Sequence, residues 1–374
     1  MHKYQKLFTI IIFLSFFQMK AEEPGDSIAW EGVNAFYNNE TARAVDILTE
    51  ARDEFPLNAA VHFTWATARW LNSQANDPIE KTYEVLNRDL DEIIPLYEYL
   101  AENYPDNPLY RLYLGSAEGL RARVYLGQKR WLKTLIPAYL GFKITKDVAD
   151  NYPEIKDAML PIGIVEYYAA LRSSILKWAA SLFGLETTKE AGLAKMEIAA
   201  TYGDFAWIEA RSLLSFIYLW EAPDIVKALE HSKILAEKFP KNFYFVLMYA
   251  ESLIKTQDYG QANTVLLKLN KDFMDLTPTQ KFQMKSYLDY EWALYWFEQD
   301  QYNKALTFTE NSIKDYQAEL DIYLTNSLLL LGNIQDVIGN RSTAKIAYQK
   351  CIKLDNNSYA VHLAKIYIDE PYKK

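Results

Sequence analysis

Two consecutive stretches decide the fold, and they read EARSLLSFIYLWEAPDIVKALEHSKILAEKFPKN (residues 209–242) and FYFVLMYAESLIKTQDYGQANTVLLKLNKDFMDL (residues 243–276). One pattern of apolar and small residues occurs in both at a spacing of 34 residues, so that Ala228 and Ala262 occupy the same position. A period of this length with small residues at fixed points is typical of stacked helical hairpins. The sequence therefore predicts an array of hairpins instead of one globular core.

The length and composition of the whole chain agree with such an array. At 374 residues the chain is too long for one compact core, yet it contains no Gly/Ser linker that would separate two domains. Half of the residues are apolar, and no sustained alternation of Val, Ile and Thr indicates a sheet. An all-α core that grows lengthwise satisfies these observations.

The charge is acidic, and it argues against nucleic acid as a partner. The formal net charge is −9, and removal of residues 1–21, which carry Lys3, Lys6 and Lys20, takes it to −12. An acidic surface repels a phosphate backbone, and no basic cluster offsets it. The single cysteine, Cys351, excludes an internal disulfide and stands where a small core residue is expected, so we expect a buried thiol.

Residues 1–21 have the pattern of a secretory signal peptide. A short basic start is followed by a predominantly apolar run over residues 7–17, which is shorter than the roughly 20 residues that a membrane-spanning helix needs. Ala21 is a suitable last residue before cleavage, although Met19 is a poor residue two positions earlier. We expect export to a periplasmic or extracellular location, with an uncleaved N-terminal membrane anchor as the alternative.

The first unit after this segment carries the most specific pattern. Counted from Gly25, positions 8, 20, 24, 27 and 32 are occupied by Gly32, Ala44, Leu48, Ala51 and Pro56. This unit resembles the tetratricopeptide repeat (TPR) family, whose 34-residue unit has these residue types at these positions. The resemblance implies an all-α, right-handed superhelical solenoid of about eight antiparallel helix pairs. The small residues have a physical role, since two helices approach closely where Gly or Ala removes bulk.

The resemblance extends over nearly all of residues 25–370. The expected units are 25–58, 59–106, 107–154, 155–208, 209–242, 243–276, 286–319 and 325–358, followed by a capping helix at 359–369. Three units end in an aromatic-Pro-x-Asn pattern, in which proline stops one helix and Asn58, Asn107 or Asn242 caps the next. Gly115 and Gly119, four residues apart, indicate a close helix crossing. Residues 159–202 are also weakly similar to the middle of the TPR39-type family.

Residues 158–184 are the most apolar part of the chain after residue 21, and two interpretations are open for them. In a helix, Glu166 and Lys177 would fall on one polar face and Tyr168 and Leu171 on an apolar one. We expect a buried helix of the solenoid, because a membrane-surface helix usually has a strongly basic polar face.

No motif for catalysis or for a cofactor or metal occurs in the sequence. His62, His231 and His362 lie in three different units, where we expect half-exposed helical positions, and no His or Cys has metal-ligand spacing. The periplasmic lytic transglycosylases also use helical superhelices, but their Glu-Ser motif is matched only by Glu251-Ser252, without the second element that they require. We therefore expect a non-enzymatic protein without a cofactor.

The candidate binding surface follows from the resemblance. In the TPR family the first helix of each unit faces the concave groove through positions 2, 5, 9, 12 and 13. Carried over to this sequence, these positions give an aromatic and acidic set: Phe36, Tyr37, Trp220, Glu221, Tyr244, Glu251, Tyr287, Tyr290, Phe297, Glu298, Asn333 and Asp336. The alternative is that many of these aromatic residues belong to the core, since large rings are generally buried.

The groove composition predicts a class of partner. Tyr and Trp provide large contact area with a polar tip, which favours binding of a protein or peptide, and an acidic groove accepts basic or neutral partners. Carbohydrate binding on the aromatic rings is the alternative. The family's clamp for a C-terminal carboxylate is not reproduced, because apolar or aromatic residues such as Ala29, Leu247 and Tyr290 stand at its Lys position.

Overall fold

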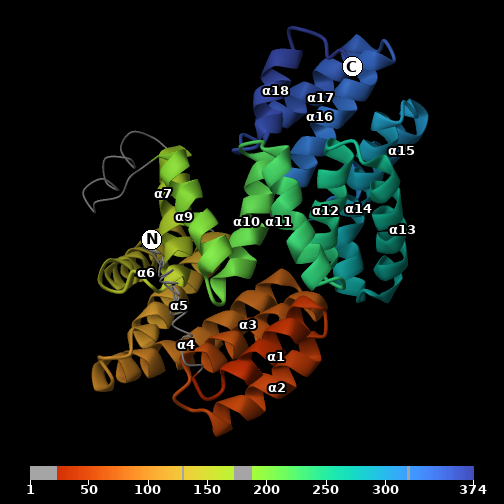
Figure 1. Cartoon of the computed structure of the whole chain (residues 1–374). Coiled ribbons are helices and arrows are strands. Elements are labelled where there is room, and N and C mark those ends of the chain that lie inside the picture. The colour runs from red at the N-terminus through yellow and green to blue at the C-terminus, as the bar shows by residue number, and fades with distance from the viewer. Residues whose placement is uncertain (1–22, 129, 172–187, 318–320) are drawn as a thin grey trace, which may run out of the picture.

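The computed structural model describes residues 23–128, 130–171, 188–317 and 321–374 (Figure 1). Over these residues the fold contains helices and no strand. The expected signal segment, residues 1–21, lies outside the described residues, as does the second half of the apolar stretch 158–184. None of the described helices is both long enough and apolar enough to cross a membrane.

The helices follow one another as antiparallel pairs, each packed against the next. The pairs are α1 (Asp26–Tyr37) with α2 (Thr41–Glu54), α3 (Ala59–Asn76) with α4 (Ile79–Asn103), α5 (Pro108–Gly127) with α6 (Trp131–Asn151), and α7 (Met159–Leu171) with α9 (Lys189–Tyr202). They continue with α10 (Ala206–Trp220) and α11 (Ile225–Lys238), α12 (Phe243–Lys255) and α13 (Tyr259–Asp275), α14 (Pro278–Glu298) and α15 (Tyr302–Lys314), and α16 (Ile322–Val337) and α17 (Arg341–Lys353). A 3₁₀ turn, η1 (Lys156–Ala158), precedes α7, and α18 (Tyr359–Tyr367) packs on the last pair. The predicted all-α helical-repeat superhelix is confirmed.

Small residues lie where the sequence pattern placed them. A Cβ atom on Gly32 would lie 2.5 Å from the Leu48 side chain, so positions 8 and 24 of the first unit face each other. The Tyr348 ring lies against Gly332 in the last pair in the same way. Two helices can pack this closely only where one of them lacks a side chain.

The turns within pairs also repeat. Asn39, Gln257, Asp300 and Gly339 each adopt a positive φ, between 57° and 87°, two residues after the last residue of the first helix. In each turn the next residue donates its backbone N–H to a carbonyl of the preceding helix, as Glu40 does to Ala35 at 2.9 Å. The same local geometry thus joins the helices of the first pair and of the last three pairs from α12 to α17.

Between pairs, the predicted asparagine caps are confirmed. Asn58, Asn107 and Asn242 each precede a helix and accept a backbone N–H of its first turn through the side-chain oxygen. Thr277 and Gln280 form a capping box, so that α14 begins at Pro278 and not at Ser286, where the unit was expected to begin.

The predicted faces of α7 need a correction. Glu166 was placed on the polar face, but it is buried and forms an ion pair of 2.6 Å with Lys195 of α9. Tyr167 is also buried, whereas Tyr168 and Leu171 are only half-buried. The reason is that α9 packs on this face and supplies the partner charge, which the pattern of α7 alone does not reveal.

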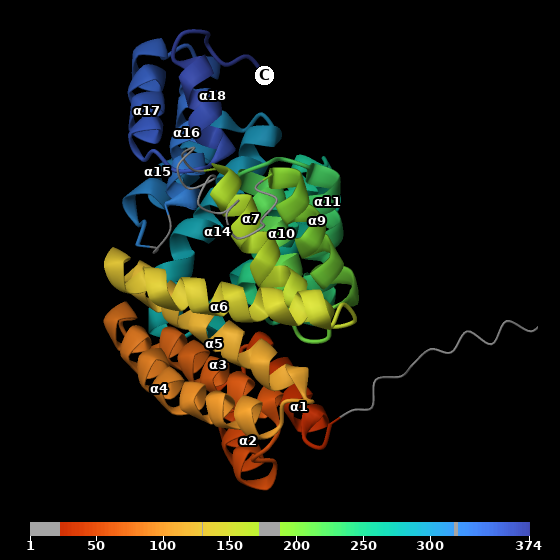
Figure 2. The same cartoon turned by 90° about the vertical axis from the view of Figure 1, so that its left-hand side faces the viewer.

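The superhelix closes on itself. Helix α14 contacts α3, and the loop between α11 and α12 contacts the loop between α1 and α2 (Figures 1 and 2). Across this seam, Lys241 pairs with Glu40 at 3.0 Å, and the Gln280 amide donates to Asn39 Oδ1 at 2.7 Å. The largest buried apolar cluster accordingly contains residues from α1 through α16.

Candidate functional site

The predicted groove residues divide into a buried and a half-buried set. The buried set consists of Phe36, Trp220, Glu251, Tyr290, Phe297 and Asn333, and the half-buried set of Tyr37, Glu221, Tyr244, Tyr287, Glu298 and Asp336. The first set is therefore part of the interior. This agrees with the alternative expectation, that many of the aromatic residues belong to the core. A role in partner binding stays a prediction, and of the half-buried residues Asp336 has a side chain that is only 1% exposed and pairs with Arg341.

A network of polar side chains explains why part of this set is buried. Trp220 Nε1 donates to both carboxylate oxygens of Glu251, at 2.9 and 2.8 Å, and Lys255 Nζ pairs with Glu251 Oε1 at 2.8 Å. Glu251 is 0% exposed, so these contacts offset the loss of its hydration. Residues that were predicted to hold a partner therefore hold successive repeats together.

Glu291 lies in the same interior without such partners. Neither of its carboxyl oxygens accepts a hydrogen bond from a described residue, and burial together with the nearby charge of Glu251 raises the pKa of Glu291 well above its ordinary value. The Glu291 carboxyl group therefore holds its proton to higher pH than an ordinary glutamate, because a second carboxylate beside Glu251 is unfavourable.

An open cleft of about 670 Å³ lies between α9, the start of α11 and the C-terminal helix α18. Helix α9 contributes Lys189, Glu190, Leu193, Ala194 and Glu197 to its lining. Tyr218 of α10, the loop residues Glu221, Ala222, Pro223 and Asp224, and Lys227 of α11 form the second wall, and Tyr359 of α18 contributes to a third. Carboxylates outnumber cations here, four to two. One of the four, Glu221, belongs to the predicted groove residues.

Glu197 is fully engaged within the protein. Its carboxylate accepts from Tyr218 Oη at 2.7 Å and from His231 Nε2 at 3.1 Å, and Lys227 Nζ lies at 3.4 Å. Burial would raise the pKa of Glu197, but the hydrogen bonds from His231 and Tyr218 and the charge of Lys227 lower it to about 2. Glu197 is therefore a structural carboxylate.

His231 is buried, which corrects the expectation of a half-exposed histidine, and His62 is buried as well. Arg211 Nη1 lies 3.2 Å from His231 Nδ1. Because a guanidinium group only donates, Nδ1 accepts and the proton of a neutral ring is on Nε2, which faces Glu197. The position of His231 is thus fixed from both sides.

Glu221 differs from Glu197 in having an uncommitted oxygen. Its Oε2 atom is buried and accepts no hydrogen bond from a described residue. Burial raises the pKa of Glu221 to about 7, against the smaller opposing effects of the Tyr167 and Tyr168 hydroxyls and of Lys189. A partly buried carboxylate oxygen without a donor, in the lining of a cleft, is suited to accept a hydrogen bond or a positive charge from a ligand.

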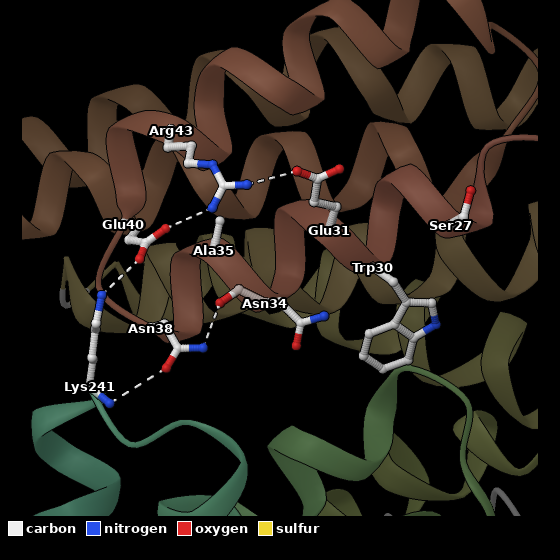
Figure 3. A pocket seen from close by; sticks show the side chains of 9 residues that line it. All are labelled: Ser27, Trp30, Glu31, Asn34, Ala35, Asn38, Glu40, Arg43 and Lys241. Atoms are coloured by element: carbon white, nitrogen blue, oxygen red, sulfur yellow. Dashed lines mark hydrogen bonds and ion pairs between the residues drawn. The ribbon is translucent and has the colours of Figure 1, made fainter.

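A second hollow, of about 460 Å³, lies at the seam (Figure 3). Its charged groups are committed to one another, since Arg43 pairs with Glu31 and Glu40, each at 2.8 Å, and Glu40 also pairs with Lys241. Figure 3 shows this chain of ion pairs along one wall of the hollow, with Trp30 at the other end. The paired charges give this hollow a structural role in joining α1 and α2 to the loop before α12.

Several residues of the α9–α18 cleft were missed in the sequence. The groove positions were taken from first helices alone, whereas α9 is the second helix of its pair and Tyr359 lies in the capping helix. The loop Glu221–Asp224 carried a usable signal, because two carboxylates flank Ala222 and Pro223 in it. Within the described residues, no three His, Cys, Asp or Glu side chains lie close enough together to hold a metal ion.

Comparison with known proteins adds information on the fold. No family model and no curated protein matches the sequence. Among solved structures, the fold is similar to a tetratricopeptide repeat protein from Parabacteroides merdae, with 11% identity, a TM-score of 0.34 and coverage of 92% of this chain and 97% of that one. It is also similar to NprR in complex with its cognate peptide NprX (13% identity, TM-score 0.45, 93% and 85% coverage) and to the hetero-tetramer Cut9–Hcn1 (15%, 0.41, 93% and 84%). With its paired helices, recurring turns and small residues at helix crossings, the chain is an all-α helical-repeat protein of TPR-like fold.

Proposed function

We propose that this chain is an exported, non-enzymatic scaffold that binds a protein or peptide segment with a basic side chain in the cleft between α9 and α18. The observation that carries the proposal is the uncommitted, buried Oε2 atom of Glu221 in the cleft lining. A Lys or Arg side chain of a partner would supply the missing donor, and a charge-assisted hydrogen bond of this kind is stronger than a neutral one.

The shape and composition of the cleft support a peptide as the ligand. Leu193, Ala222 and Pro223 provide apolar contact, while Glu190 and Asp224 add negative charge around Glu221. A small apolar surface with a few oriented polar groups is the usual composition of a ligand site. Carbohydrate binding finds less support, because Trp220 and Tyr290, two of the rings expected to stack on sugars, are buried.

The proposal can be tested by selecting binders from a random peptide library on the purified protein. We expect enriched peptides to contain Lys or Arg, and Glu221→Gln to weaken their binding by about tenfold to a hundredfold, as for loss of a hydrogen bond to a charged group. Glu31→Gln is the matched control, since Glu31 is an exposed carboxylate in the other hollow. Equal binding by wild type and Glu221→Gln, or enrichment of acidic peptides, would reject the cleft as the site.

Export is the second part of the proposal, and the sequence of residues 1–21 supports it. Fractionation of the producing cell with N-terminal sequencing should recover a chain that begins near Glu22 in the periplasmic or extracellular fraction. An intact N-terminus in the membrane fraction that resists a carbonate wash would favour the anchored alternative, and an intact N-terminus in the cytoplasmic fraction would reject export.

A further inference from the structure

Helix α6 exposes an apolar face that no described element covers. Leu132, Leu135 and Ile136 are 85%, 64% and 69% exposed, and Leu140 continues the same face at helical spacing. Leu126, at the end of α5, is exposed beside the start of α6. Single exposed apolar residues are ordinary, but a contiguous exposed apolar patch marks an interaction site. We call these five residues the α6 face.

Among the residues that the structure describes, none needs the α6 face for packing. The opposite side of α6 packs on α5 through Pro137, Gly141 and Thr145, which are spaced four residues apart and are buried. A Cβ atom on Gly141 would lie 2.7 Å from the Gly115 carbonyl oxygen of α5, so small residues make this contact. Figure 2 shows α6 on the side of the molecule that faces the viewer, which places its outer face at the surface.

Cations lie at both ends of the α6 face. Arg130 and Lys133 stand at the start of the helix and Lys143 follows Leu140, all three exposed and without an ion pair among the described residues. The next carboxylates along α6 are engaged, because Asp147 pairs with Arg111 and Asp150 with Lys146. The local charge of this region is therefore positive in a protein whose net charge is negative.

We infer that α6 lies flat on an anionic lipid surface, with the α6 face in contact with the boundary between headgroups and acyl chains. Leucine and isoleucine beside Lys and Arg are typical of interfacial helices, in which the apolar face enters the membrane and the cations contact anionic headgroups. The acidic residues elsewhere do not prevent this contact, because charges more than about 8 Å away are largely screened at physiological ionic strength.

A fluorophore on α6 reports on this contact directly. Leu135→Cys can be labelled with an environment-sensitive dye in the full chain, since the natural cysteine, Cys351, is buried. The control is Leu267→Cys on α13, another exposed apolar position far from α6 in the chain. With vesicles of phosphatidylcholine containing about a third phosphatidylglycerol, we expect a blue shift of emission at position 135 and none at position 267. Because both proteins contain residues 1–21, binding through that segment alone would leave position 135 unshifted.

Variants that remove a positive charge near the α6 face test whether an anionic membrane, and not another partner, contacts it. Arg130→Gln and Lys133→Gln should each weaken vesicle binding on the order of fivefold, and added salt should weaken it further. No shift at position 135 with anionic vesicles, or an equal shift with pure phosphatidylcholine, would overturn the inference. A blue shift that appears without vesicles and grows with protein concentration would identify a second copy of the chain as the partner of the α6 face. A blue shift without vesicles that does not depend on concentration would show that the protein covers this face itself. Both of these results would also overturn it.

Discussion

Some glycine residues of this protein lie where two helices come close together. Of Gly115 and Gly119 in α5, the first is needed for such a contact and the second is not. A Cβ atom on Gly115 would lie 2.5 Å from Thr145 Oγ1 and 3.0 Å from the Gly141 carbonyl oxygen. At Gly119 a Cβ atom would meet nothing within 4 Å. The sequence predicted one close crossing from this pair, and the structure assigns the steric requirement to Gly115.

Alanine substitutions should therefore have opposite effects at these two sites. Gly115→Ala should destabilise the fold by about 1–3 kcal/mol, because the backbone of α6 must move away. Gly119→Ala should stabilise it by about 0.5–1 kcal/mol, because alanine is the better helix former. Urea unfolding of both variants measures the difference, and similar losses at both sites would contradict the assigned packing.

Glu221 gives a prediction on pH and stability. Its pKa is raised by burial from 4.5 to about 7, so between these values the folded chain keeps a proton that the unfolded chain has released. Stability from this group therefore falls as the pH rises from 4.5 through 7, and the full penalty is present above 7. Tyr167, Tyr168 and Lys189 lie on the packed helices and reduce the shift, while Glu190, Glu197 and Asp224 share the cleft with Lys227.

The substitution Glu221→Gln should remove this penalty. We expect almost unchanged stability near about pH 5 and an increase near about pH 8, where the wild-type group is ionised. Thermal or urea unfolding at the two pH values provides the measurement. A loss of stability at the higher pH would mean that the carboxylate has a partner and would weaken the case for a ligand contact.

For the buried carboxylate of Glu251, the sequence did not predict burial. The repeat register correctly placed Glu251 on the inner side of its helix, but the 34-residue period does not indicate whether that side faces solvent or other helices. The answer depends on Trp220 of the preceding pair, which packs on α12 and donates to Glu251, and on Lys255, which pairs with Glu251 from one turn further along α12. Cys351, by contrast, was correctly predicted as buried, because its position in the repeat is always internal.

At the scale of helices and turns, local sequence accounts for most of the structure. In the loop between α1 and α2, Asn39 takes the left-handed conformation that asparagine tolerates better than most residues. The aromatic-Pro-x-Asn pattern likewise located the boundaries between pairs. The faces of α7 could not be predicted in this way, because they depend on Lys195 in another helix.

The asparagine caps should differ in importance. Asn242 Oδ1 accepts one bond, from the Phe245 N–H at 3.0 Å, whereas Asn58 is buried, caps Val61 and also donates to the Pro24 carbonyl and Asp26 Oδ1. We expect Asn242→Ala to cost about 1 kcal/mol and Asn58→Ala about 2–3 kcal/mol in unfolding free energy. Equal costs in urea unfolding would show that the bonds from Asn58 to the preceding segment contribute little.

At the scale of the whole molecule, the seam decides how open the concave side is. Its polar contacts are exposed, but the Tyr37 ring also packs on Phe239 and Phe245, with ring centroids 5.1 and 5.6 Å apart. Exposed ion pairs contribute about 0–1 kcal/mol, while aromatic packing contributes more. The repeat pattern predicted the superhelix but not this closure, which joins residues of different repeats.

Variants at the seam should show which contacts hold it. Lys241→Ala should change stability by less than about 1 kcal/mol and leave the radius of gyration unchanged. Tyr37→Ala should cost about 2 kcal/mol or more and enlarge the molecule in small-angle X-ray scattering, because the loops separate. Expansion caused by Lys241→Ala alone would assign the closure to the ion pair instead.

The seam also has a consequence for biosynthesis. Glu40 and its partner Lys241 are 201 positions apart, and Asn39 and Gln280 are 241 apart. At a translation rate of about 5–20 residues per second, Phe239 and Phe245 are synthesised roughly 10–40 s after Tyr37, the ring on which they pack. During that interval the Tyr37 ring of the nascent chain is exposed, whereas the folded protein partly covers it. Chaperones that recognise exposed rings would therefore engage the newborn chain through its first helical pair and release it only when the later repeats arrive.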